Sequence, residues 1–203
     1  EKAAASPIQE PVSAQNASGQ EPIGPYQVLG MLEERAEDTL LLGFDPRLLR
    51  RVWLRLHPGK DGSPRHPVTR FTRLRWLASG MTADHHWDAY EAPAGTALLQ
   101  LAREPQPWSV VRGWLHDLAQ ELEASRREGS LPPTLGLDQL WITAEQRLKV
   151  LPFTAPGPGN APKVQAAHFL NHTAQTVLEG LAVPPAAAME RAAHAPMPAA
   201  ARA

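Results

Sequence analysis

The first half of the chain carries its apolar residues in short runs, separated by polar or proline-containing segments. Three such runs, at 26–32, 39–44 and 51–56, have the length of β-strands and follow one another closely. They predict an antiparallel meander. A further run at 87–91 precedes Pro93 and Gly95, a pattern that predicts a strand ending in a turn.

The clearest helix of the chain is predicted at 107–128. Pro107 suits the first turn of a helix and Gly129 suits the residue just past its end. Five apolar side chains recur at helical spacing and would share one face: Trp108, Val111, Leu115, Leu118 and Leu122.

Three further elements are predicted with less regular patterns. A short helix is predicted at 68–77, because Val68, Phe71 and Leu74 recur at helical spacing, and a hairpin is predicted at 140–151. A second long helix is predicted at 164–181, with one side formed by Ala167, Leu170, Ala174, Val177, Leu178 and Leu181.

The two ends of the chain differ from the rest. Residues 1–22 contain few large hydrophobes and residues 183–203 are rich in Ala and Pro, so both are predicted to be flexible tails. The chain begins at Glu1 instead of Met, which suggests a piece of a longer protein.

Composition narrows the function classes. Lys and Arg number 20 against 21 Asp and Glu, so no overall field drives the chain toward nucleic acid, and no nucleic-acid partner is expected. The absence of cysteine excludes disulfides and thiolate metal sites. No stretch approaches the roughly 20 apolar residues that span a bilayer, so membrane association is expected only through a partner or a missing segment.

The order of these elements resembles a bacterial-type protein kinase, namely the small lobe and the first half of the large lobe. Residues 90–98 resemble the hinge of the family, and 114–124 resemble the helix that enters the catalytic loop. Residues 137–154 are similar to the family's run from the catalytic-loop Asn to Asp-Phe-Gly. The resemblance implies an α+β, two-lobed protein-kinase-like fold, with a small antiparallel β lobe at 23–95 and an abbreviated, mainly helical lobe at 96–182.

The departures from the family fall where its chemistry would sit. On this resemblance Arg55 replaces the strand lysine, Thr134 the catalytic Asp, Gln139 the Mg-binding Asn, and Pro152 the metal-binding Asp, while Glu91 is the hinge acid. The turn that should be Gly-rich carries four acids, Glu33, Glu34, Glu37 and Asp38, which would repel a triphosphate. The resemblance therefore implies a degenerate, pseudokinase-type cleft with no catalytic residue, no cofactor and no metal site.

Two chemical alternatives arise from the remaining residues. Asp138 and Glu91 are the acids nearest the implied cleft and could form a general acid/base or metal pair, although surface carboxylates are common. His85 and His86, with His57 and His66 upstream, do not have the spacing of a recognised zinc site. We therefore expect neither the Asp138–Glu91 pair nor the histidines to serve in catalysis or metal binding.

The distribution of positive charge along the chain is the feature that most strongly indicates a binding function. Between residues 47 and 75 there are nine Lys or Arg against one acid, Asp61. They predict a basic docking face for phosphate, acidic peptide or anionic lipid, built from Arg47, Arg50, Arg51, Arg70, Arg73 and Arg75. Alternatively, these charges are solvated or pair with the acids of the 33–38 turn.

The sequence thus favours a catalytically inactive binding or scaffolding module that makes protein–protein contacts in a larger assembly. Its expected location is the cytoplasm or the cytoplasmic face of a membrane complex. Two alternatives remain open. One is an atypical nucleotide-binding protein or phosphotransferase that uses the same cleft, and the other is a structural subunit whose tails drape over neighbouring chains.

Overall fold

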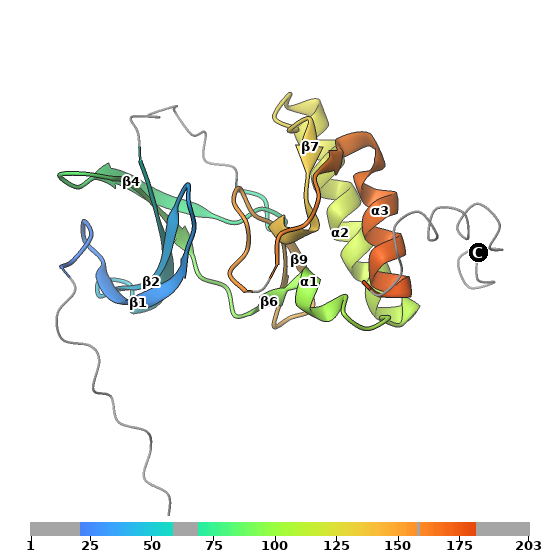
Figure 1. Ribbon diagram of the computed structural model, residues 1–203, viewed down its shortest axis with the longest axis horizontal. Coiled ribbons are helices and arrows are strands. Elements are labelled where there is room, and N and C mark those ends of the chain that lie inside the picture. The colour runs from blue at the N-terminus through green and yellow to red at the C-terminus, as the bar shows by residue number, and fades with distance from the viewer. Residues whose placement is uncertain (1–20, 59–68, 158, 182–203) are drawn as a thin grey trace, which may run out of the picture.

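The computed structural model describes residues 21–58, 69–157 and 159–181, which form two lobes that lie side by side (Figure 1). The tails predicted at 1–22 and 183–203 fall outside these residues, except for residues 21 and 22, which are exposed and have no regular structure. The two lobes correspond to the β-rich and helix-rich halves predicted from the sequence.

The small lobe is built on a five-stranded antiparallel sheet in the order β1-β2-β3-β5-β4. The predicted meander and the strand at 87–91 are confirmed, whereas the sequence pattern did not reveal β4. The strands are β1 (Gln27–Glu34), β2 (Thr39–Asp45), β3 (Arg50–His57), β4 (Trp76–Met81) and β5 (His86–Glu91).

Both faces of the central strand β3 are covered. Val52 and Leu54 pack on one face with Trp87 and the segment around Tyr26, while Trp53 packs on the other face. All three strand residues are buried, which explains why β3 reads as a continuous apolar run instead of an alternating one. The face that carries Trp53 continues into the large lobe.

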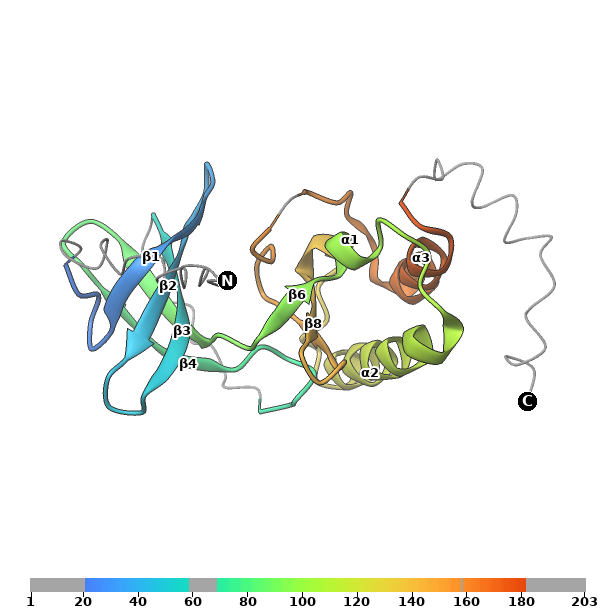
Figure 2. The ribbon, with the colours of Figure 1, turned by 90° about the horizontal axis from the view of Figure 1, so that it is seen from below.

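The large lobe contains two long helices that pack together (Figure 2). Helix α2 (Trp108–Arg127) begins after Pro107 and ends before Gly129, whose φ of 67° lies in the left-handed region that favours glycine. Helix α3 (Ala166–Glu179) follows the pairing of β7 (Thr134–Leu135) with β10 (Val164–Gln165). The remaining elements are β6 (Gly95–Ala97), α1 (Leu98–Leu101), a 3-10 turn (Leu137–Gln139), β8 (Leu140–Thr143) and β9 (Leu148–Val150).

The predicted contact face of α3 was partly wrong. The buried residues of this helix are Phe169, Thr173 and Val177, whereas Ala167 and Leu181 are exposed. Phe169 is fully buried and lies one position away from the predicted stripe. Within the described residues, no helix is long and apolar enough to cross a membrane.

The helix predicted at 68–77 is wrong over its described part. Residues 69–75 contain a turn followed by an extended segment that forms a bridge with β9, with the N–H of Val150 bonded to Thr72 O at 2.7 Å and the N–H of Leu74 bonded to Val150 O at 3.1 Å. Lys149 Nζ also donates to Phe71 O at 2.8 Å. These tertiary hydrogen bonds replace those of a helix, so the local pattern is overridden.

Candidate functional site

The surface between the lobes is the first candidate, because clefts at domain boundaries commonly bind ligands. Here it is occupied by aromatic side chains of the chain itself. Trp53 of β3 meets Trp141 of β8 edge-to-face with ring centroids 5.0 Å apart, and Phe153, which follows β9, lies 5.1 Å from Tyr90. All four rings are buried. They belong to one apolar cluster that joins the lobes.

Arg35 closes the same region from the β1–β2 turn. Its guanidinium donates to the backbone oxygens of Thr154 and Ala155, each at 3.1 Å, and is held by the carboxylate of Glu33. The turn thus reaches across to the segment that follows Phe153. No pattern in the sequence predicts this contact, since it joins residues about 120 positions apart.

Arg55, which the resemblance places at the strand lysine, lies at this junction. Its Nε donates to Asp38 Oδ2, and its guanidinium carbon lies 5.8 Å from the centre of the Phe153 ring. Asp38 is buried, so its charge faces Arg55 instead of solvent. Part of the acidic turn is therefore internally neutralised.

The other positions implied by the resemblance are spread over the large lobe. Thr134 is exposed on β7, where it pairs with Gln165, and Pro152 is exposed directly after Leu151. Gln139 accepts from the N–H of Gly136 at 3.1 Å and from Lys163 Nζ at 2.9 Å. Of these positions, Gln139 and Pro152 line one small cavity of about 240 Å³.

The acids considered as a pair do not share a site. Glu91 is half-buried at the end of β5, where its N–H bonds to Arg75 O at 3.0 Å. Asp138 is buried and accepts from Thr154 Oγ1 at 3.2 Å and Lys163 Nζ at 3.3 Å. Among the described residues, no group of three or more His, Asp or Glu could hold a metal ion.

Gly136 makes room for the Asp138–Lys163 pair. A Cβ atom at position 136 would lie 2.1 Å from Asp138 Oδ1 and 3.0 Å from Lys163 Nζ, distances that a side chain cannot tolerate. Lys163 and Thr154 were missed as polar partners of the loop at 136–139. No spacing in the sequence links them to it.

The residues predicted to form one basic face separate into two groups. Arg70 and Arg73 turn inward and bind the buried carboxylate of Glu121 on α2, with Arg70 bidentate at 2.9 and 3.0 Å. Arg50 lies 3.6 Å from Asp45. The remaining three side chains, those of Arg47, Arg51 and Arg75, are exposed.

Glu121 is the centre of a hydrogen-bonded network that sequence reasoning missed. Burial alone would raise the pKa of Glu121, but hydrogen bonds from Arg70, Thr72 and Arg73 outweigh it and lower this pKa to about 2. Thr72 Oγ1 donates at 2.6 Å and Ser125 Oγ at 2.9 Å. The carboxylate anchors the extended 69–75 segment to the large lobe.

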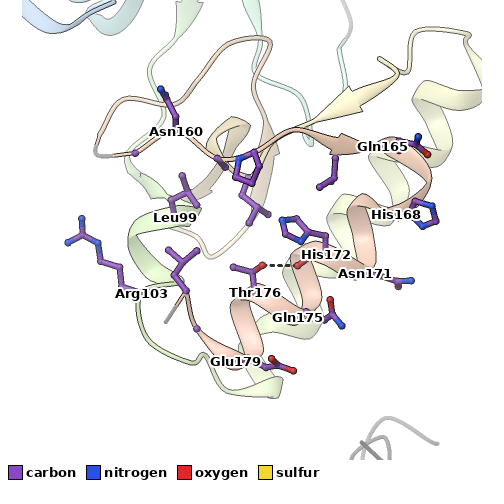
Figure 3. A pocket seen from close by; sticks show the side chains of 17 residues that line it. Leu99, Arg103, Asn160, Gln165, His168, Asn171, His172, Gln175, Thr176 and Glu179 are labelled. Atoms are coloured by element: carbon purple, nitrogen blue, oxygen red, sulfur yellow. Dashed lines mark hydrogen bonds between the residues drawn. The ribbon is translucent and has the colours of Figure 1, made fainter. Parts of the chain in front are cut away.

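A groove of about 820 Å³ lies on the large lobe beside α3 (Figure 3). Leu99 and Arg103 lie across it from His172 and Thr176 of α3. Burial lowers the pKa of His172, and its Nε2 has no hydrogen-bond partner in the described structure. The apolar walls of the groove can accept an apolar group.

Comparison with known proteins identifies the fold. No family model matches the sequence, and no curated protein matches it. Among solved structures, the chain is similar to the PknI kinase domain of Mycobacterium tuberculosis, with 18% identity and a TM-score of 0.57 over 81% of this chain and 77% of that chain. The chain therefore has a protein-kinase-like α+β fold with an abbreviated helical lobe.

Proposed function

We propose that this chain is a catalytically inactive, kinase-like module that binds other proteins in a larger assembly. The observation that carries the proposal is the contact of Trp53 with Trp141 across the cleft. A planar base between two walls needs about 7 Å of separation, twice a van der Waals contact of roughly 3.5 Å. Two rings whose centres are 5.0 Å apart leave no such gap.

The polar side of the cleft supports the same conclusion. Arg55, which lies over the Phe153 ring, is engaged by Asp38, and Arg35 is engaged by Glu33 and by backbone oxygens after Phe153. A triphosphate would have to displace these carboxylates before it could use either arginine. At the positions that the resemblance assigns to Mg²⁺ ligands, Gln139 and Pro152 offer no anionic oxygen, which hard divalent cations prefer.

The binding role is supported by the groove beside α3. Its volume lies within the range typical of ligand sites, its walls include Leu99, Leu137 and Val164, and His172 leaves a buried nitrogen without a partner. A partner segment with an apolar side chain would fit between these walls. The groove is formed without any residue of the filled cleft.

Thermal unfolding with and without ATP and Mg²⁺ tests the inactive cleft. A nucleotide at 100 times its dissociation constant stabilises a native state by about 2.7 kcal/mol, so binding would be easily seen. We expect no shift for the wild type and no phosphate transfer from labelled ATP. A Mg²⁺-dependent shift or transfer would overturn the proposal in favour of an atypical nucleotide-binding protein or phosphotransferase.

Trp53→Ala is the informative variant for this test, because alanine is the residue that the resemblance expects at this position, two residues before the strand lysine. If the tryptophan fills the cleft, this variant opens a space next to Trp141 and takes up adenine analogues that the wild type excludes. Trp53→Phe serves as the matched control, since its ring retains most of the volume.

The binding half of the proposal is tested with Thr176→Arg, which places a long cation in the groove. A partner captured by the wild-type chain in its native cells should be lost with this variant and retained with Trp53→Phe. Unchanged thermal unfolding of Thr176→Arg is the required control. A partner that still binds this variant does not use the groove.

A further inference from the structure

The turn between β2 and β3 carries two leucines whose side chains are exposed to solvent. Leu48 is 61% exposed and Leu49 is 77% exposed. Leu49 also has a φ of 51°, in the left-handed region that residues with a Cβ seldom occupy. Such a conformation costs of the order of 1 kcal/mol and persists where the surrounding structure imposes it. Both features run against stability, which points to a role for the turn.

Asp45 imposes the shape of this turn. Its Oδ1 accepts from the N–H groups of Arg47 and Leu48 at 3.1 and 3.2 Å, and its Oδ2 lies 3.6 Å from Arg50 Nε. Asp45 itself is only 6% exposed. The hydrogen bonds to Asp45 therefore fix the backbone of the turn, and in this conformation the two leucine side chains are exposed to solvent.

The leucines are flanked in the sequence by positively charged residues. Arg47 and Arg51 are exposed on either side of them, and Arg50 is partly exposed. Asp45 is the sole acid between Thr39 and Pro58, and its oxygens are directed at the turn backbone and Arg50. We call this unit, residues 45–51, the basic leucine turn.

We propose that the basic leucine turn docks the protein onto the surface of a membrane that contains anionic lipids. Exposed leucines flanked by arginines match the interface of a bilayer. Leucine enters the acyl boundary there, and arginine stays at the level of the phosphates. The contact is peripheral. It is independent of the cleft and of the groove.

A bilayer fits the turn better than a protein partner does. A protein would have to offer an apolar pocket with a carboxylate rim at one place, because the turn presents two exposed leucines between arginines. An anionic leaflet presents acyl chains beneath negative charge at every point. Arg47 and Arg51, which flank the leucines in the sequence, remain exposed, as does Arg75 farther along the chain, whereas Arg70 and Arg73 are directed at Glu121.

Vesicle binding by the full chain tests the proposal. Vesicles with 30% phosphatidylserine should sediment the protein, whereas pure phosphatidylcholine vesicles should not. Leu48→Ser/Leu49→Ser should weaken this binding at least tenfold. Arg47→Gln/Arg51→Gln should weaken it by about 25-fold, since each arginine near an anionic surface contributes about fivefold.

Matched controls separate this site from general effects. Arg126→Gln/Arg127→Gln removes the same charge from an exposed part of α2, and Met81→Ser removes an apolar side chain that is 63% exposed on β4. Both should bind vesicles like the wild type. Thermal unfolding of each turn variant shows that the fold is intact.

Because the chain has no cysteine, a dye attached at Leu48→Cys reports on this position alone. Its emission should shift to shorter wavelength with phosphatidylserine vesicles and remain unchanged with phosphatidylcholine vesicles. The proposal is overturned if the dye stays in water, if the turn variants bind as tightly as the wild type, or if binding does not depend on anionic lipid.

Discussion

The lobes contact each other in two regions, which we call the cleft seam and the rear seam, and different interactions stabilise each of them. In the cleft seam, formed by Arg35, Trp53, Trp141 and Phe153, aromatic rings pack across the interface and one arginine bonds to backbone oxygens. In the rear seam, formed by the 69–75 segment and Glu121, a buried carboxylate gathers two arginines and a threonine. The first depends chiefly on shape and the second on charge.

The difference shows that two kinds of interaction, which respond differently to pH and salt, hold the two lobes together. Apolar packing is insensitive to pH and salt, whereas a buried carboxylate stabilises only while it remains ionised. We therefore expect acid to weaken the rear seam first and leave the cleft seam packed. The variants below separate the two contributions.

The largest effect is expected for Trp53→Ala in the cleft seam. Removing a buried tryptophan leaves a cavity and costs about 4 kcal/mol of unfolding free energy. Denaturant unfolding should report this loss at low and high salt alike. A loss under about 1 kcal/mol would mean that the ring contributes little packing.

Glu121→Gln should have the next largest effect, and one that depends on pH. A pKa of about 2 in the folded protein, against 4.5 in the unfolded chain, corresponds to about 3 kcal/mol. Because the folded pKa is depressed, this stabilisation is complete above pH 4.5 and is lost as the pH falls toward 2. Unfolding free energies measured across that range should fall for the wild type and stay nearly level for the variant.

Glu123→Gln is the matched control on the same helix. Glu123 pairs with Arg126 and Arg127 in solvent, so its loss should leave the unfolding midpoint nearly unchanged. If the unfolding free energy of Glu121→Gln falls at low pH as much as that of the wild type does, the pH dependence belongs to another carboxylate.

Arg35→Ala should weaken the cleft seam by a smaller amount, about 1.5 kcal/mol, because two charge-assisted hydrogen bonds are lost at a partly exposed site. Amide hydrogen exchange at 153–157 should become faster, since the segment after Phe153 loses its tether. Arg127→Ala, which removes an exposed arginine, should leave this exchange unchanged.

Thr72→Val is expected to have the smallest effect, about 1 kcal/mol, because it removes one hydrogen bond to Glu121 and keeps the shape of the side chain. The pKa of Glu121 should rise, which moves the acid limb of the stability curve to higher pH. Thr96→Val is the control for a threonine outside the seam, because the hydroxyl of Thr96 bonds to the exposed Gln100.

The elements with strong local patterns could be predicted from the sequence. The strands of the meander, α2 with its stop at Gly129, and the hairpin at 140–151 follow from periodicity and turn residues, and the structure confirms them. The candidate site was harder. Arg55, Gln139 and Pro152 could be placed only through the resemblance, and the contacts that fill the cleft were not foreseen, because Arg35 meets a segment about 120 residues away.

The sequence by itself determined where the meander strands, α2 and the hairpin at 140–151 form, because periodicity, Pro107 and Gly129 act over a few residues. It also determined which residue types stand at the positions implied by the kinase resemblance. Only the tertiary structure decided the state of 69–75, which is extended because β9 and Glu121 supply its hydrogen-bond partners. It also decided which arginines remain at the surface. The physical reason is that a buried carboxylate must find cations, and which cations reach it depends on the packing of distant segments.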